Sequence, residues 1–167
     1  MLFHEVVAMH IRPAQTADAA AACDVLRRSI AELCAADHGN DTRFLSRWLA
    51  NKTPENVAAW ISDPGNVVYV AIDAGAIVGV ASMTRAGLIT LNYVSPDARF
   101  KGVSKALLAT LERKAADLGL TQCRLESTKT ARRFYESAGY REQRAGAASG
   151  CGTNAGGSCL TMVKSLI

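Results

Sequence analysis

Apolar residues recur along the chain in two periods, one typical of strands and one typical of helices. Alternation at every second residue, or a short apolar run, predicts a strand, whereas apolar residues three and four positions apart predict an amphipathic helix. The predicted strands span 5–12, 67–72, 76–83, 88–94, 121–127, 140–144 and 159–166. The predicted helices span 16–34, 44–50, 54–61, 103–118 and 130–138.

Turn and capping residues support these boundaries. Thr16 and Thr53 are expected to cap the first and third helices, and Pro54 stands at a first helical position. The sequence Asp-Ala-Gly at 73–75 predicts a hairpin, and Gly119 is expected to end the helix that precedes it. The resulting order of elements predicts an α+β domain, in which helices cover the faces of a mixed sheet.

Composition points to one ordinary globular domain over residues 1–167, in which residues 1–8 form an N-terminal extension. Apolar residues make up 49% of the chain and charged residues 20%. The net charge of +4 is low for a nucleic-acid-binding protein, and no apolar run reaches the length of about 20 residues that spans a membrane. We therefore expect no nucleic-acid or membrane partner, and a cytoplasmic location.

The five cysteines predict neither a metal site nor a disulfide framework. Their number is odd, and Cys151 and Cys159 are separated by seven residues without histidine partners. We expect five reduced thiols that pack as small apolar residues. The glycine-rich stretch 145–158 lacks a phosphate-binding spacing and is expected to be a hairpin loop.

The stretch LNYVSPDARFKGVSKALL, residues 91–108, combines a strand, a basic turn and the start of a helix. The first N–H groups of a helix have no intrahelical partner, and the helix dipole is positive there. Gly102 lets an anion approach these groups, and Arg99, Lys101 and Lys105 add positive charge. This pattern predicts a phosphate or pyrophosphate site at residues 102 to 105, although solvated surface charges are the alternative.

Two motifs in this sequence resemble the GNAT acyltransferase superfamily. VSPDARFKGVSKALL is similar to the family's pyrophosphate loop, with Arg99 at the Gln/Arg position, Gly102 at the first glycine and Ser104 where Gly or Ala is usual. STKTARRFYESAGYRE is similar to a second family motif, a strand leading into a helix that carries Tyr135. The order of the elements also agrees, so the resemblance covers nearly the whole chain.

The resemblance implies a three-layer α/β/α fold whose mixed, mostly antiparallel sheet of six to seven strands splays between its fourth and fifth strands. It also implies that acetyl-CoA is the cosubstrate and that no metal is needed. The backbone N–H of Tyr93 or Val94 would then bind the thioester oxygen. The residues expected to bind the cofactor are Tyr93, Val94, Arg99, Lys101, Gly102, Val103, Ser104, Lys105, Thr128 and Ala131.

Tyr135 is the expected proton donor. Attack of an amine on a thioester expels a thiolate, and a phenol with a pKa of about 10 is still protonated at neutral pH and can donate to that sulfur. The alternative is that Tyr135 only packs against the sheet. No general base stands out: Asn92 could position a water, and the other candidates are Asp37, His38, Asp41 and Glu126.

The sequence therefore predicts an N-acetyltransferase in which a primary amine attacks acetyl-CoA directly in a ternary complex. No cysteine in either motif lies beside a histidine, which argues against a covalent intermediate. A non-catalytic CoA-binding regulatory module and a protein-interaction domain of the same fold are the alternatives. The acceptor, a small molecule or a peptide amine, is not specified by any motif, and a homodimer paired through the C-terminal strands is an open alternative to a monomer.

Overall fold

The structure, a computed structural model, describes residues 8–143 and 159–167. Most of the predicted N-terminal extension and the glycine-rich loop 145–158 therefore lie outside the described residues. Among the described residues, no helix is both long and apolar enough to span a bilayer.

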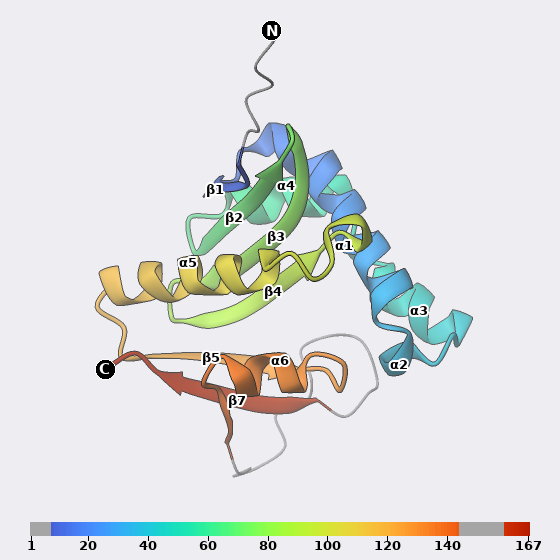
Figure 1. Ribbon diagram of the computed structural model, residues 1–167. Coiled ribbons are helices and arrows are strands. Elements are labelled where there is room, and N and C mark those ends of the chain that lie inside the picture. Colours follow the sequence, from blue (N-terminus) through green and yellow to red (C-terminus); the bar gives the residue numbers. More distant parts are fainter. Residues whose placement is uncertain (1–7, 144–158) are drawn as a thin grey trace, which may run out of the picture.

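A single sheet of seven strands, in the order β1-β2-β3-β4-β5-β7-β6, forms the centre of the fold (Figure 1). All neighbouring strands are antiparallel except β4 and β5, which are parallel. The strands are β1 (His10–Pro13), β2 (Asn66–Asp73), β3 (Ala76–Thr84), β4 (Leu88–Val94), β5 (Gln122–Ser127), β6 (Arg141–Glu142) and β7 (Leu160–Ser165). The predicted mixed, mostly antiparallel sheet is confirmed.

Helices cover both faces of the sheet and complete the predicted three layers (Figure 1). On one face, α1 (Ala19–Leu33) and α4 (Pro54–Ser62) bury their apolar sides against β2 and β3. On the other face, α5 (Val103–Asp117) and α6 (Arg132–Ser137) enclose the larger core cluster. Two shorter helices, α2 (Ala35–His38) and α3 (Thr42–Leu49), follow α1 and pack near its C-terminal end.

The sheet opens between β4 and β5, as the resemblance implied. These two strands pair only at Leu88 with Arg124 and at Ile89 with Leu125. A register irregularity in the β3–β4 pairing leaves Thr90 without a partner residue on β3, immediately after the last β4–β5 pair. Such a bulge bends a strand, and residues 91–94 diverge from β5.

A close helix–sheet contact fixes where α5 begins. An added Cβ at Gly79 on β3 would lie 2.7 Å from Cγ1 of Val103 and 2.8 Å from Cδ1 of Leu107. Only glycine allows this approach, so the first turn of α5 is pressed against the sheet beside the β4–β5 opening. The N-terminus of the longest helix on this face is thereby held at the mouth of the gap.

The predicted boundaries differ from the structure at several helix ends. The prediction of Thr16 as an N-cap is wrong: the first turn is a short 3₁₀ helix (Thr16–Asp18) whose N-cap is Gln15, and α1 follows from Ala19. Asp18 closes this turn because its carboxylate accepts from the N–H of Gln15 at 2.7 Å and from Arg12 at 2.8 Å. The helix predicted over 44–50 is α3, which begins earlier, at Thr42, because Asp41 caps it.

Candidate active site

A pocket of about 480 Å³ lies at the β4–β5 opening. This volume is within the range of about 300–1,000 Å³ typical of small-molecule sites. Eleven of the twelve residues singled out from the sequence line this pocket: Asn92, Tyr93, Val94, Arg99, Gly102, Val103, Ser104, Lys105, Thr128, Ala131 and Tyr135. The twelfth, Lys101, is exposed on the same loop but does not line the pocket.

The N-terminus of α5 forms one end of the pocket. Gly102 is the N-cap residue, with φ of +78°, and no side chain caps the helix. An added Cβ at Gly102 would meet no atom within 4 Å, so the space above it is open. Uncapped N–H groups, the helix dipole and the cations Arg99 and Lys105 together favour a bound anion here.

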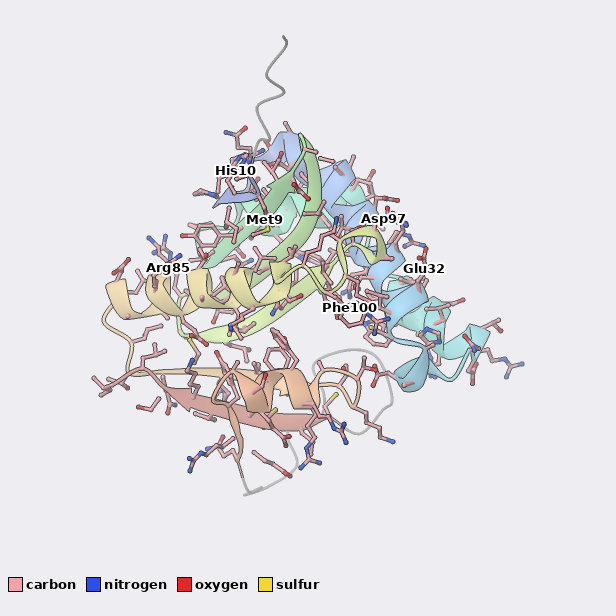
Figure 2. The ribbon with its side chains drawn as sticks, in the orientation of Figure 1. Met9, His10, Glu32, Arg85, Asp97 and Phe100 are labelled. Atoms are coloured by element: carbon pink, nitrogen blue, oxygen red, sulfur yellow. The ribbon has the colours of Figure 1, made fainter. Side chains whose placement is uncertain are left out.

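The loop that leads into α5 is strained and tied to α1. Phe100 has φ of +64° and its side chain is 90% exposed, with the guanidinium of Arg99 4.6 Å from its ring centre. Asp97 on the same loop forms an ion pair with Arg28 of α1 at 2.9 Å. Figure 2 shows Phe100, Asp97 and Glu32 gathered on the side of the molecule where this loop meets α1. The ion pair holds the loop at the rim of the pocket.

The edge of β4 offers backbone groups to the pocket. The N–H of Ser95 donates to the carbonyl of Val78 on β3 at 2.7 Å. Alternate residues of a strand direct their N–H groups to the same side, so the N–H of Tyr93 also points toward β3. The N–H groups of Asn92 and Val94 therefore point to the opposite side, into the gap between β4 and β5.

Tyr135 lies in the pocket close to Asn92. Its side chain is only 8% exposed, and its ring packs edge-on against Phe134 and Tyr140. Burial raises the pKa of Tyr135 to about 12, while a hydrogen bond with Asn92 acts in the opposite direction. Asn92 also donates from Nδ2 to the carbonyl of Ser104 at 3.4 Å, and its buried Oδ1 has no partner among the described residues. The pocket thus contains a protonated phenol and an available amide oxygen.

Three of the four titratable candidates for a general base lie outside the pocket lining. His38 is buried, its Nδ1 accepts from the N–H of Asn40 at 3.0 Å and its Nε2 contacts the carbonyl of Ala31. Asp41 caps α3. Asp37 accepts hydrogen bonds from the N–H and the hydroxyl of Thr130, across the mouth of the gap. The remaining candidate, Glu126, does line the pocket.

The first helix contributes a wall that the sequence did not reveal. Ser29, Leu33 and Cys34 line the pocket from α1 and its C-cap. The side chain of Leu33, the last residue of α1, is only half-buried and faces the pocket. The one available signal was Ser29, a polar residue within an apolar helical stripe, and by itself it is weak.

The cysteines are not all reduced. Cys23, Cys34 and Cys123 are free and buried, as expected, but Cys159 is disulfide-bonded, so the prediction of five reduced thiols is wrong there. Among the residues that the structure describes, no group of three or more His, Cys, Asp or Glu side chains could hold a metal ion.

Solved structures of proteins described as acetyltransferases share this fold. A GCN5-related N-acetyltransferase from Rhodopseudomonas palustris is 26% identical, with 96% of this chain and 97% of that chain covered and a TM-score of 0.81. PaiA N-acetyltransferase from Thermoplasma acidophilum, in complex with coenzyme A, is 17% identical, with 95% of this chain and 99% of that chain covered and a TM-score of 0.76. The yncA protein from Salmonella typhimurium, with its cofactor acetyl-CoA, is 21% identical (96% and 95% covered, TM-score 0.69).

The fold and the pocket therefore define an acetyltransferase-like domain. Residues 34–152, more than half of the chain, match the family model for the acetyltransferase (GNAT) domain. The protein belongs to the GNAT acetyltransferase family. No curated protein sequence matches it significantly.

Proposed function

We propose that the protein is an acetyl-CoA-dependent N-acetyltransferase, which moves the acetyl group to a primary amine by direct attack in a ternary complex. One observation carries this proposal: a single pocket joins an uncapped helix N-terminus, an open strand edge and a buried, protonated tyrosine. These are the three features that binding a thioester with a pyrophosphate on its CoA part, and expelling the CoA thiol, require.

The start of α5 would hold the pyrophosphate. The N–H groups of Val103, Ser104 and Lys105 lie in the first turn, where they have no intrahelical acceptors. Gly102 leaves the approach open, and Arg99 and Lys105 supply formal charge. Lys101, exposed on the loop, would contribute only longer-range attraction.

The gap would hold the pantetheine arm as an added strand. Asn92 and Val94 direct backbone groups into the gap, and Thr128 and Ala131 face it from the other side. Of the two N–H groups considered for the thioester oxygen, Val94 is favoured, because that of Tyr93 points to β3. A fixed N–H donor in a partly dry site stabilises negative charge that develops on this oxygen.

Tyr135 would donate a proton to the departing sulfur, and Asn92 would hydrogen-bond the attacking nucleophile. With its pKa near 12, Tyr135 keeps its proton at neutral pH and can donate it to the departing sulfur. The amide of Asn92 can hydrogen-bond the phenol oxygen, which leaves the phenol proton for the thiolate. The unpaired Oδ1 of Asn92 can accept from the attacking amine or from a water.

The cysteines of the pocket support direct transfer. Burial raises the pKa of Cys34 to about 12, with a smaller contribution from Asp37, so it remains a poorly nucleophilic thiol. Cys159 is bonded in a disulfide. Neither residue offers the thiolate that an acetyl-enzyme would need.

Calorimetric titration with acetyl-CoA tests this proposal through two matched variants. Gly102 and Gly119 lie at opposite ends of α5, have φ of +78° and +79°, and would each place a Cβ in open space. An aspartate at either position brings similar backbone strain and the same charge, but only the one that replaces Gly102 faces the anion site. We expect Gly102→Asp to weaken acetyl-CoA binding at least about tenfold while Gly119→Asp leaves it unchanged.

Equal affinities of the two variants for acetyl-CoA would show that residues 102 to 105 do not form the anion site. Failure of the unmodified protein to bind acetyl-CoA at millimolar concentration would overturn the proposed function.

A further inference from the structure

The pocket passes through the sheet and has two chemically different halves. Asn92, Tyr135 and the start of α5 lie on the face covered by α5 and α6. Tyr93 packs with the clusters under α1 and α3, on the opposite face. If the first half takes the thioester, as proposed above, the half beside α1 receives the amine.

The half beside α1 is largely apolar. It is lined by Ser29, Leu33, Cys34, Leu91 and Tyr93, with Glu126 on the β5 side. Burial raises the pKa of Cys34 to about 12, and burial also raises the pKa of the Tyr93 hydroxyl. Both groups are therefore uncharged at neutral pH. Behind Tyr93 lies Trp48, only 3% exposed, so the inner wall is aromatic.

Glu126 is the one carboxylate among the described lining residues. At the rim, Asp97 and Glu32 share the single cation Arg28, and Asp37 accepts hydrogen bonds from Thr130. The two cations that line the pocket, Arg99 and Lys105, lie at the N-terminus of α5, where the pyrophosphate is proposed to bind.

The distribution of charged side chains in this half of the pocket determines which amines bind favourably. Among the described lining residues of this half only Glu126 is a carboxylate, so a second ammonium buried there would be desolvated without a second carboxylate. An acceptor carboxylate would likewise find no cation among the described residues that line this half. An apolar body, in contrast, gains by burial, and an apolar environment lowers the pKa of the reacting amine and raises the fraction that is nucleophilic.

We propose that the acceptor is a primary monoamine carried on an uncharged, apolar body, such as an alkyl or aryl group. This inference rests on the proposed acetyltransferase function. It excludes polyamines, aminoglycosides and free amino acids as preferred acceptors.

Three probes of equal chain length test the inference with the full-length protein and acetyl-CoA: hexylamine, 1,6-diaminohexane and 6-aminohexanoate. They differ only in the group at the far end, which is a methyl, an ammonium or a carboxylate. We expect kcat/KM for hexylamine to exceed that for each charged probe at least about tenfold, because the far group must enter the largely apolar half.

A pair of variants at Leu33 checks that this half of the pocket sets the preference. Leu33 is the last residue of α1 and is only half-buried, so a polar replacement is tolerable for the fold. Leu33→Asp should raise the diamine-to-hexylamine ratio of kcat/KM about tenfold or more, because it supplies the missing carboxylate. Leu33→Asn has nearly the same shape without the charge and should shift the ratio less than about threefold.

The outcomes separate this inference from the function on which it rests. Faster acetylation of 1,6-diaminohexane, spermidine or kanamycin than of hexylamine would overturn the monoamine proposal and leave the acetyltransferase function standing. Equal effects of Leu33→Asp and Leu33→Asn would show that the α1 wall does not set the preference. No acetylation of any amine by protein that binds acetyl-CoA would overturn both proposals.

Discussion

At the scale of single residues, backbone geometry identifies the functional loop as clearly as side-chain chemistry does. The left-handed conformations at Phe100 and Gly102 lie two residues apart, immediately before α5. Glycine accepts such a φ freely, but for a bulky aromatic residue it costs about 1–2 kcal/mol. Strain of this kind persists where the surrounding structure imposes it, and here the Arg28–Asp97 ion pair and the start of α5 fix the loop on both sides.

We predict that Phe100→Gly stabilises the protein, although it removes a side chain. Relief of about 1–2 kcal/mol of strain exceeds the extra chain entropy of glycine, about 0.5–1 kcal/mol. The ring is 90% exposed, so little apolar burial is lost, and loss of its contact with the Arg99 guanidinium costs about 0.5 kcal/mol. The net gain of up to about 1 kcal/mol corresponds to a rise of about 2–4 °C in Tm for a chain of this size. Thermal unfolding followed by circular dichroism measures it, and a fall in Tm would show that the ring, rather than the backbone, governs stability here.

At the scale of elements, the C-terminal part of the sheet is held by more than strand pairing. With two residue pairs between β4 and β5, side chains must supply much of the connection. Glu112 on α5 accepts from the hydroxyl of Tyr140 at 3.0 Å and from Nζ of Lys164 on β7 at 2.9 Å. One carboxylate thus joins α5 to the segment after α6 and to β7, which keeps the gap at a fixed width.

Removal of this carboxylate should be strongly destabilising. We expect Glu112→Ala to lower the free energy of unfolding by about 2–3 kcal/mol, because the hydroxyl of Tyr140, whose side chain is 1% exposed, loses its acceptor. Glu112→Gln keeps an acceptor and should lose less. The control is Glu136→Ala, which breaks an exposed pair with Arg132 and should change stability by less than about 1 kcal/mol. Urea unfolding measures all three, and equal losses at 112 and 136 would contradict this account.

At the scale of the whole molecule, local signals in the sequence were sufficient for most elements but not for the complete site. Thr53 and Pro54 begin α4, and Gly75 takes a positive φ in the β2–β3 turn, because these preferences act within a few residues. Thr16 failed as a cap because Arg12 and Gln15 engage Asp18 instead.

The wall formed by Ser29, Leu33 and Cys34 depends on how far α1 overhangs β4, which no short-range pattern encodes. The opening between β4 and β5 was predicted only through the family resemblance. The anion site at the N-terminus of α5 could be predicted because its cations and glycine are close together in the sequence. The half of the pocket beside α1, in contrast, is assembled from three elements that are distant in the sequence.

The most direct test of the central claim compares wild type with Tyr135→Phe. The measurement is release of the CoA thiol from acetyl-CoA in the presence of hexylamine, together with the Kd for acetyl-CoA. We predict that kcat falls about 10²–10³-fold while Kd is unchanged, because the phenol acts as a proton donor and not as a binding group.

The pH dependence of the same reaction shows whether Tyr135 acts in its protonated form, as a proton donor must. A proton donor works below its pKa, and that of Tyr135 is about 12, so the wild-type rate should rise with pH as the amine loses its proton and should not decline below about pH 11. An unchanged kcat in Tyr135→Phe, or a wild-type rate that falls between about pH 8 and pH 10 while the fold is intact, would contradict Tyr135 as the proton donor.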